Sequence, residues 1–340
     1  MVAWQNVRLL PGEHSKGPQM QIQNRQTFWN IDSVSECLSA FWKVELVQSR
    51  PGALSLDFCH ASVGECVVYE CRTNVELVAS GARSEHYVTI SPITGHCAAS
   101  RYRGQEIKPG QLLLMEPRGE VFQQLAAGHR QLAVSIPIHL FRKVAAAEFI
   151  PAERVDAFLA WRNMVPNHRK YQRLCSYLSG LLSGKGPLPE RPDADVYLTE
   201  TILDVLFDDE TQETHVATHQ NHRRIVWESL DLIHAHPHRA PSILELCGTV
   251  GVSRRALFYA FGELLGLSPK VYIKKFRLGE ARRVIINNRK ERCIQRVARE
   301  LGFIHEGQFS IDYSSAFGES PSQTRQRFLG LHQGVPEVAG

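Results

Sequence analysis

The sequence predicts a two-domain protein, with a β-rich N-terminal domain and an all-α C-terminal domain that contains two helix-turn-helix motifs. Its 340 residues exceed the usual size of one domain. Between residues 25 and 150, short apolar runs alternate with Gly and Pro turns, which is typical of strands. Nearer the C-terminus, a unit of two apolar-periodic stretches separated by a glycine occurs twice, roughly fifty residues apart.

Residues 1–24 are expected to be an N-terminal extension, because they lack the apolar core and cleavage site of a signal peptide. No window reaches about 18 uninterrupted apolar residues, so no membrane partner is expected. The eight cysteines include no CxxC pair, which indicates small buried hydrophobes in a reducing compartment. We therefore predict a cytoplasmic protein.

Residues 25–150 are predicted to form a barrel or sandwich that serves as a sensor or dimerisation domain. The clearest strand candidates are residues 53–58, 65–69, 86–90, 111–115 and 131–136. A barrel of this size can hold one small ligand. The closely spaced His-x-His set that a metal-dependent enzyme of this shape would need does not occur among His60, His86, His96 and His129. We expect no enzymatic activity, catalytic residue, cofactor or metal.

Residues 151–207 carry apolar stripes at helical spacing, from Phe158 to Leu182. Such helices can pair two protomers or cover the barrel, and both alternatives remain open. The polar run at residues 208–222 is predicted to be an interdomain linker. Its histidines, His215, His219 and His222, are interpreted as solvated side chains, since no Cys or carboxylate completes a metal site beside them.

The two repeated units lie within residues 223–330. In the first, Leu246 and Val250 precede Gly251, and the next helix begins after Ser253, a plausible N-cap. In the second, Gly302 takes the equivalent place. Glycine suits such a sharp turn because it tolerates positive φ, and the unit then presents its second helix to a DNA major groove.

Positive charge is concentrated in this segment. Residues 222–330 hold 18 Lys and Arg against 10 Asp and Glu, whereas the rest of the chain holds 21 against 25. A basic surface neutralises phosphates and adds salt-sensitive affinity, so the asymmetry favours double-stranded DNA as the partner.

The segment from Arg224 to Phe328 resembles the DNA-binding domain of AraC/XylS family transcription regulators. The first signature comprises Ser253, Leu257, Phe261, Gly266, Ser268, Pro269, Tyr272, Arg277 and Ala281. The second comprises Ala298, Leu301, Gly302, Phe303, Phe309, Ser310, Phe317, Gly318, Ser320 and Pro321. The run Gly302, Phe303, His305, Gly307, Phe309 is similar to the subgroup of ethanolamine-operon regulators. The turn around Pro109 resembles that of the family's cupin-like sensor barrels.

This resemblance implies a ligand-responsive activator of a nearby catabolic or stress operon. Its partners would be DNA, RNA polymerase, an unidentified small-molecule effector and possible second copies of the chain. The joining helix would run from Pro269 to Ile286 and hold the two recognition helices about one DNA turn apart. A constitutive or protein-regulated DNA binder, whose barrel only dimerises, remains the alternative.

Base contacts are expected on the exposed faces of the two recognition helices. Arg255 can donate two hydrogen bonds to a guanine, and Gln308 suits an adenine edge. The full set is Arg254, Arg255, Phe258, Tyr259, His305, Glu306, Gln308, Ser310 and Ile311. The family usually places Arg where Ile311 stands, so the second helix is expected to bind more weakly.

Phosphate contacts are expected from the first N-cap and from the joining helix and its flank. They comprise Ser253, Lys270, Lys274, Lys275, Arg282, Arg283 and Arg292. Arg277 has two competing interpretations, a phosphate contact or a structural ion-pair partner, which we weigh evenly.

Overall fold

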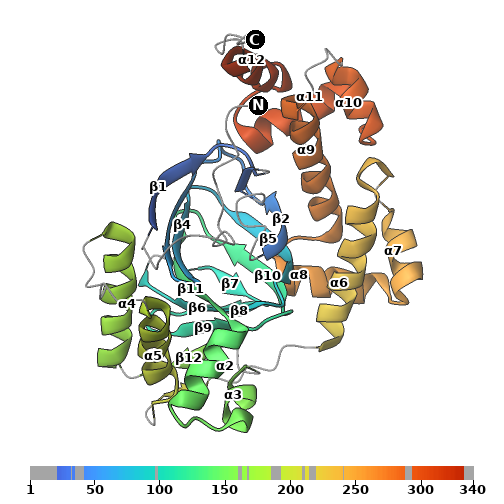
Figure 1. The fold of residues 1–340 in the computed structure, drawn as a ribbon. Coiled ribbons are helices and arrows are strands. Elements are labelled where there is room, and N and C mark those ends of the chain that lie inside the picture. The colour runs from blue at the N-terminus through green and yellow to red at the C-terminus, as the bar shows by residue number, and fades with distance from the viewer. Residues whose placement is uncertain are drawn as a thin grey trace, which may run out of the picture. The chain divides into compact units, whose positions relative to one another are not determined.

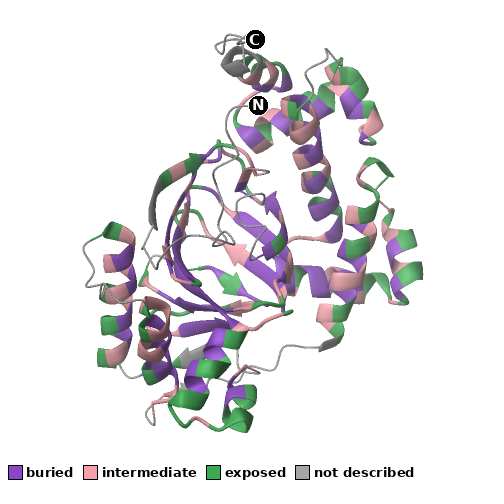
Figure 2. Cartoon of the chain, viewed as in Figure 1, coloured by how far each residue is buried: buried purple, intermediate pink, exposed green. Residues whose placement is uncertain are grey.

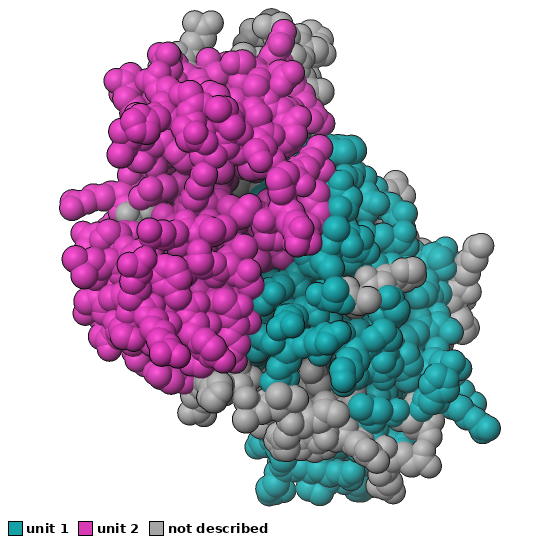
Figure 3. Space-filling model, turned by 180° about the vertical axis from the view of Figure 1, so that it is seen from behind, with its two compact units in different colours: residues 1–45, 55–74, 79–217 teal, residues 46–54, 75–78, 218–340 magenta. Residues whose placement is uncertain are grey.

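The computed structural model describes residues 21–31, 33–34, 42–95, 99–159, 163–166, 168–184, 193–208, 211–213, 220–239, 241–287 and 293–332. The chain divides into two compact units, one of residues 1–45, 55–74 and 79–217 and one of residues 46–54, 75–78 and 218–340 (Figure 3). We call the strands and helices up to residue 213 the N-terminal domain and the helices from residue 220 onward the C-terminal domain.

The described strands of the N-terminal domain form two sheets rather than a closed barrel (Figure 1). The first has eight strands in the order β1 (Gln21–Phe28), β3 (Leu56–Val63), β4 (Cys66–Thr73), β11 (Arg130–Pro137), β6 (Tyr87–Pro92), β9 (Leu112–Met115), β12 (Asn163–Val165) and β13 (Gln212–Glu213). The second has five, in the order β2 (Trp42–Gln48), β5 (Leu77–Arg83), β10 (Glu120–Leu125), β7 (Arg101–Tyr102) and β8 (Gln105–Glu106).

The strands β3, β4, β6, β9 and β11 each contain or overlap one of the predicted runs. Within the eight-stranded sheet the pairing is antiparallel, as between β3 and β4, where Leu56 faces Thr73. The prediction of a β-rich N-terminal domain is confirmed. The short strand β13 lies within the predicted linker and pairs with β12, so this part of residues 208–222 belongs to the sheet.

One face of the eight-stranded sheet is covered by helices α2 (Ile138–Ala147), α3 (Ala152–Leu159), α4 (His168–Ser183) and α5 (Ala194–Leu206). Their apolar stripes and the sheet share one core, in which Val68, Val134, Phe141, Leu178 and Ile202 are almost fully buried (Figure 2). These stripes are therefore used within the protomer, as the covering alternative for residues 151–207 expects.

The C-terminal domain is all-α, as predicted. Its elements are α6 (Gln220–Ala235), a 3-10 turn (Pro237–Arg239), α7 (Ile243–Val250), α8 (Arg254–Leu265), α9 (Pro269–Asn287), α10 (Ile294–Glu300), α11 (Glu306–Phe317) and α12 (Pro321–His332). Gly251 and Gly302 lie in the turns with φ of 69° and 76°, the left-handed conformation expected of them. The joining helix α9 begins at Pro269, as the sequence indicates.

Each motif has its own apolar contacts. In the first, Leu246 and Val250 of α7 and Leu257 and Phe261 of α8 are buried. In the second, Phe309, Tyr313 and Phe317 of α11 pack with α9 and α10. Because these inward positions repeat at helical spacing, they fix which faces of α8 and α11 point outward. Within the described residues, no helix combines the length and apolar character needed to cross a membrane.

Candidate nucleic-acid interface

Both helices of the first motif begin at a serine cap. The Ser242 hydroxyl accepts a hydrogen bond from the Glu245 amide, and the Glu245 carboxylate accepts one from the Ser242 amide. Ser253 does the same for α8, where its Oγ accepts from the amide of Ala256 at 3.2 Å. The prediction that Ser253 is an N-cap is confirmed, and this bond fixes where α8 begins.

The outward face of α8 carries a mixed cationic and aromatic surface. Arg254 and Arg255 are exposed in its first turn, and Tyr259 is 65% exposed one turn further on. The Arg254 guanidinium lies 5.3 Å from the centre of the Phe258 ring, at cation–π distance. The four residues predicted to contact bases on this helix thus lie toward its outward face.

Helix α6 supports this face through His222, a residue predicted to lie in the linker. His222 Nδ1 lies 2.5 Å from Glu263 Oε2 of α8, and the His222 ring lies 5.2 Å from the Tyr259 ring. His222 therefore lies in α6 rather than in a linker and contacts the recognition helix. Its spacing from Ile225, Val226 and Ser229, all buried, is the signal that could have placed it on a helix.

The outward face of α11 is less basic. Ile311 is 64% exposed, and Gln308 and Ser310 are also exposed. His305 occupies the N-cap position without a side-chain capping bond, and Glu306 in the first turn lies 3.6 Å from Arg299 Nε. The residues predicted to contact bases on this helix lie in its N-terminal half, and of these Gln308 and Ile311 share the exposed face opposite the buried Phe309 and Tyr313.

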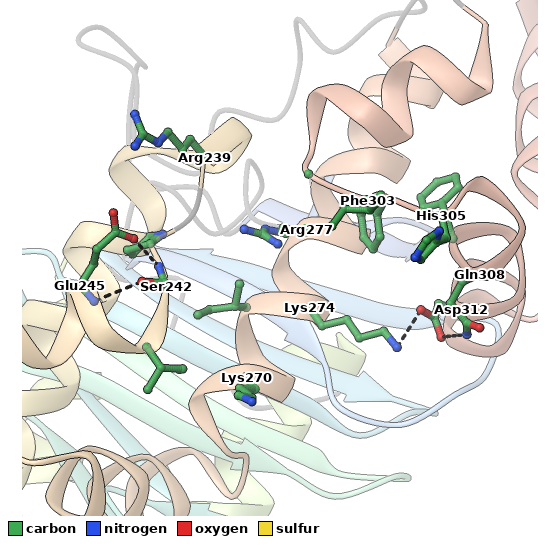
Figure 4. A pocket seen from close by; sticks show the side chains of 16 residues that line it. Arg239, Ser242, Glu245, Lys270, Lys274, Arg277, Phe303, His305, Gln308 and Asp312 are labelled. Atoms are coloured by element: carbon green, nitrogen blue, oxygen red, sulfur yellow. Dashed lines mark hydrogen bonds and ion pairs between the residues drawn. The ribbon is translucent and has the colours of Figure 1, made fainter.

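The Asp312 carboxylate contacts two of the residues predicted to bind DNA, one by a hydrogen bond and one by an ion pair. Gln308 Nε2 donates to Asp312 Oδ1 at 3.0 Å, and Lys274 Nζ of α9 lies 2.7 Å from Asp312 Oδ2 (Figure 4). We call these three residues the Asp312 clasp. The clasp ties the joining helix to the second recognition helix and neutralises the Lys274 charge, so Lys274 is not a freely available cation.

A pocket of about 700 Å³ lies between the two motifs and is open to one side of α9 (Figure 4). Lys270, Lys274 and Arg277 line it from α9 at intervals of four and three residues, which places them on one helix face. The first motif contributes Arg239, Pro241, Ser242, Ile243 and Glu245, and the second contributes Gly302, Phe303, Ile304, His305, Gln308, Phe309 and Asp312. Its charged side chains are four cations and two carboxylates.

The other residues predicted to contact phosphate lie in different environments. Lys270 is exposed, whereas burial lowers the pKa of the partly buried Lys275. Arg283 pairs with Glu280 at 2.7 Å.

Arg282 pairs with Glu319 at 2.7 Å, and its guanidinium lies 4.8 Å from the centre of the Phe317 ring, with only 11% of its side chain exposed. The Arg282 guanidinium is thus used inside the second motif, and its phosphate contact stays a prediction. Arg292 lies outside the described residues.

Arg277 is half-buried beside the turn of the second motif. A Cβ atom added to Gly302 would lie 3.5 Å from the guanidinium carbon of Arg277. Burial lowers the pKa of Arg277. The arginine therefore packs against the Gly302 turn while it also lines the pocket, so both of its predicted roles remain compatible with its position.

A family model for a helix-turn-helix domain matches residues 246–327, which include both motifs. The XylDLEGF operon transcriptional activator of Pseudomonas putida is 24% identical over 305 residues, which cover 84% of each chain. The chain belongs to the AraC/XylS family. It is a DNA-binding transcription regulator, as the sequence predicts.

Other regulatory proteins also match the chain. A probable thc operon regulatory protein of Rhodococcus erythropolis is 31% identical over 100 residues, which cover 29% of this chain and 30% of that protein. A solved AraC-type regulator from Chromobacterium violaceum is 28% identical, with a TM-score of 0.30, and covers 31% of this chain and 93% of its own. The AraC-like activator CuxR is 13% identical, with a TM-score of 0.40 and coverages of 76% and 95%.

Proposed function

We propose that this AraC/XylS regulator reads its DNA site with α8 and α11 and activates a nearby operon when a small molecule binds its N-terminal domain. The observation that carries the proposal is the outward placement of Arg254, Arg255 and Tyr259 on a helix whose other face is buried. A helix held in this way can enter a major groove without losing its packing. Because the chromosome is the target, we propose that the protein acts in the cytoplasm, in contact with RNA polymerase.

In this proposal Arg255 is the main base-reading residue of the first motif. It makes no ion pair in the described part of the chain, so its guanidinium is available for the O6 and N7 atoms of a guanine. Phe258 and Tyr259 lie beside it and would contact a thymine methyl group. Arg254, held over Phe258, would contact either a base or the adjoining phosphate.

The second motif would read DNA less tightly. Glu306 and Asp312 add negative charge at α11, and Ile311 offers apolar contact where a cation would serve better. Gln308 remains suited to an adenine, provided that it leaves its hydrogen bond with Asp312. We therefore propose that α8 supplies most of the sequence specificity and that α11 adds a weaker contact.

The pocket between the motifs would receive the DNA backbone that joins the two major-groove contacts. Exposed Lys270 and the cations Arg239 and Arg277 line it, and phosphate contacts of this kind fix the position on the duplex without reading sequence. Lys274 would contribute fully only when Asp312 releases it.

The test is genome-wide mapping of the protein on its own chromosome, combined with transcript measurements in a deletion strain. We expect sharp binding peaks beside an operon whose transcription falls when the protein is absent. Binding spread evenly along the chromosome would contradict sequence-specific binding. Increased transcription on deletion would contradict activation but not DNA binding.

A further inference from the structure

Helix α6 packs against α8, the first recognition helix (Figure 1). Ile225, Val226 and Ser229 of α6 are fully buried, so one face of this helix is fixed in the domain. His222 lies one turn before them, with only 17% of its side chain exposed. The packing of α6 therefore keeps the His222 ring beside α8 before DNA is bound.

His222 contacts two residues of α8 that are one helical turn apart. Its Nδ1 atom lies 2.5 Å from Glu263 Oε2, and its ring centre lies 5.2 Å from that of Tyr259, a separation typical of aromatic pairs. Because a carboxylate accepts hydrogen bonds, Nδ1 is the donor, and this bond fixes the plane of the imidazole. A ring of fixed orientation thus lies against the Tyr259 ring.

The contact matters more for the direction of Tyr259 than for the stability of the fold. The Tyr259 side chain is 65% exposed, so the contact buries little area. It does favour one rotamer of a side chain that is otherwise exposed to solvent. Arg255, Tyr259 and Glu263 follow one another at intervals of four residues along α8, so they share a face. His222 therefore constrains the middle residue of this face through the residue at its C-terminal end.

The second motif has a basic residue at the equivalent position. The motifs repeat with a displacement of fifty-two residues, which relates the buried pairs Phe261 and Tyr313, Val226 and Leu278, and Ile233 and Ile285. The same displacement relates His222 of α6 to Lys274 of α9. The two supporting helices thus place a basic side chain at the same point of the repeat.

Both basic residues contact a carboxylate of the recognition helix that they support. His222 contacts Glu263 and Tyr259, whereas Lys274 belongs to the Asp312 clasp. Each of these groups includes a residue predicted to contact bases, since the clasp contains the glutamine that suits an adenine edge. This recurrence indicates that the supporting helix orients a base-contacting side chain in each motif.

We propose that His222 is a positioning residue for base reading by the first motif, because with Glu263 it holds the Tyr259 ring in the rotamer that contacts DNA. This inference rests on the proposed base contact of Tyr259. It adds a specificity-determining residue that lies outside residues 246–327, which the family model matches. A side chain that is ordered before binding loses less conformational entropy on binding, which is worth about 2- to 10-fold in affinity.

The test is a double-mutant cycle on the full chain, with binding to the mapped operator and to random DNA measured by fluorescence anisotropy. We expect His222→Ala to weaken operator binding about 2- to 10-fold, to leave binding to random DNA unchanged and to reduce preference at the base pair that Tyr259 contacts. In the Tyr259→Ala background, His222→Ala should cause no further loss, because the ring that it orients is absent. His236→Ala, at an exposed histidine, is the control and should change neither binding.

Additive losses from His222→Ala and Tyr259→Ala would overturn the proposal, because they would show that His222 does not act through Tyr259. An equal loss on operator and random DNA would overturn it as well, since it would show that His222 only stabilises the domain.

Two variants of Glu263 test the orientation of the imidazole, and they keep the proposal testable if His222→Ala fails to fold. Glu263→Gln and Glu263→Ala both remove the charge, but only glutamine keeps an acceptor for His222 Nδ1. We expect Glu263→Ala to lower the ratio of operator to random-DNA affinity and Glu263→Gln to retain most of it. Equal ratios for the two variants would contradict the positioning role.

Failure of this inference can be told apart from failure of the proposed function. If Tyr259→Ala lowers the ratio of operator to random-DNA affinity but His222→Ala does not, base reading by Tyr259 is supported and the positioning role fails. If Tyr259→Ala leaves this ratio unchanged, the proposed base contact of Tyr259 fails, and the role of His222 fails with it.

Discussion

At the scale of single residues, Arg255 offers the sharpest test of base reading. Its side chain is exposed and unpaired in the described part of the chain, so removing it leaves packing unchanged. We expect Arg255→Ala to weaken binding to the operator by about 1–3 kcal/mol and to relax preference at one base pair. Fluorescence anisotropy with the operator and with random DNA measures both effects. An equal loss on both DNAs would show that Arg255 contacts only phosphate.

The Asp312 clasp makes a second prediction at this scale. Asp312→Asn removes the charge that holds Lys274, so we expect tighter binding to all sequences and a salt dependence steeper by about one counterion. Lys274→Ala should then weaken binding more in the Asp312→Asn background than in the wild type. Because the Lys274 side chain is half-exposed, the effect on folding should be small. Weaker binding by Asp312→Asn would show instead that the clasp orients α11 for contact.

At the scale of elements, the second turn can be tested with two glycines. Gly302 has a φ of 76°, whereas Gly279 lies inside α9 with open space around it. We expect Gly302→Ala to lower the free energy of unfolding by about 1–2 kcal/mol, because an L-residue is strained there. Gly279→Ala, the control, should raise it by about 0.5–1 kcal/mol. Urea unfolding followed by circular dichroism compares them, and equal effects would contradict the role of the turn.

Helix α6 gives the C-terminal domain a pH dependence. Burial lowers the pKa of His234 to about 4, and its Nε2 atom lies 3.0 Å from the Tyr272 hydroxyl. The unfolded chain therefore binds a proton at a pH where the folded chain does not. Stability should fall as pH decreases from about 6.5 to about 4, by at most about 1.4 kcal/mol per unit. His234→Gln should reduce this slope, whereas the exposed His238→Gln should not. An unchanged slope in His234→Gln would contradict the assignment.

The helical motifs were predictable because their signals are local. Caps such as Ser253, turn glycines and apolar spacing are each complete within a few residues. The contacts of His222 with Glu263 and Tyr259 could not be predicted, since they join residues far apart in the chain. The ion pair between Arg282 and Glu319 could not be predicted either, because it also joins residues far apart in the chain. A basic residue on a helix has the same local pattern whether it contacts a phosphate or a carboxylate.

At the scale of the whole molecule, the division into a β-rich and an all-α domain followed from the change of hydrophobic period along the chain. The arrangement of strands did not, because β12 and β13 join the sheet from segments with little strand signal. The hydrogen bond from Gln123 of β10 to Gln131 of β11, which joins the two sheets, was equally hidden. Alternation predicts that a residue lies inside, but whether it finds a partner there depends on the other sheet.

In the proposed function both recognition helices contact one operator, with α8 supplying most of the specificity. The most direct measurement is the affinity of the full chain for the mapped operator with every base pair changed in turn. We predict two blocks of sensitive positions about one helical turn apart, with the block weakened by Arg255→Ala costing more per change. A single block, or a stronger block that ignores Arg255→Ala, would contradict this account.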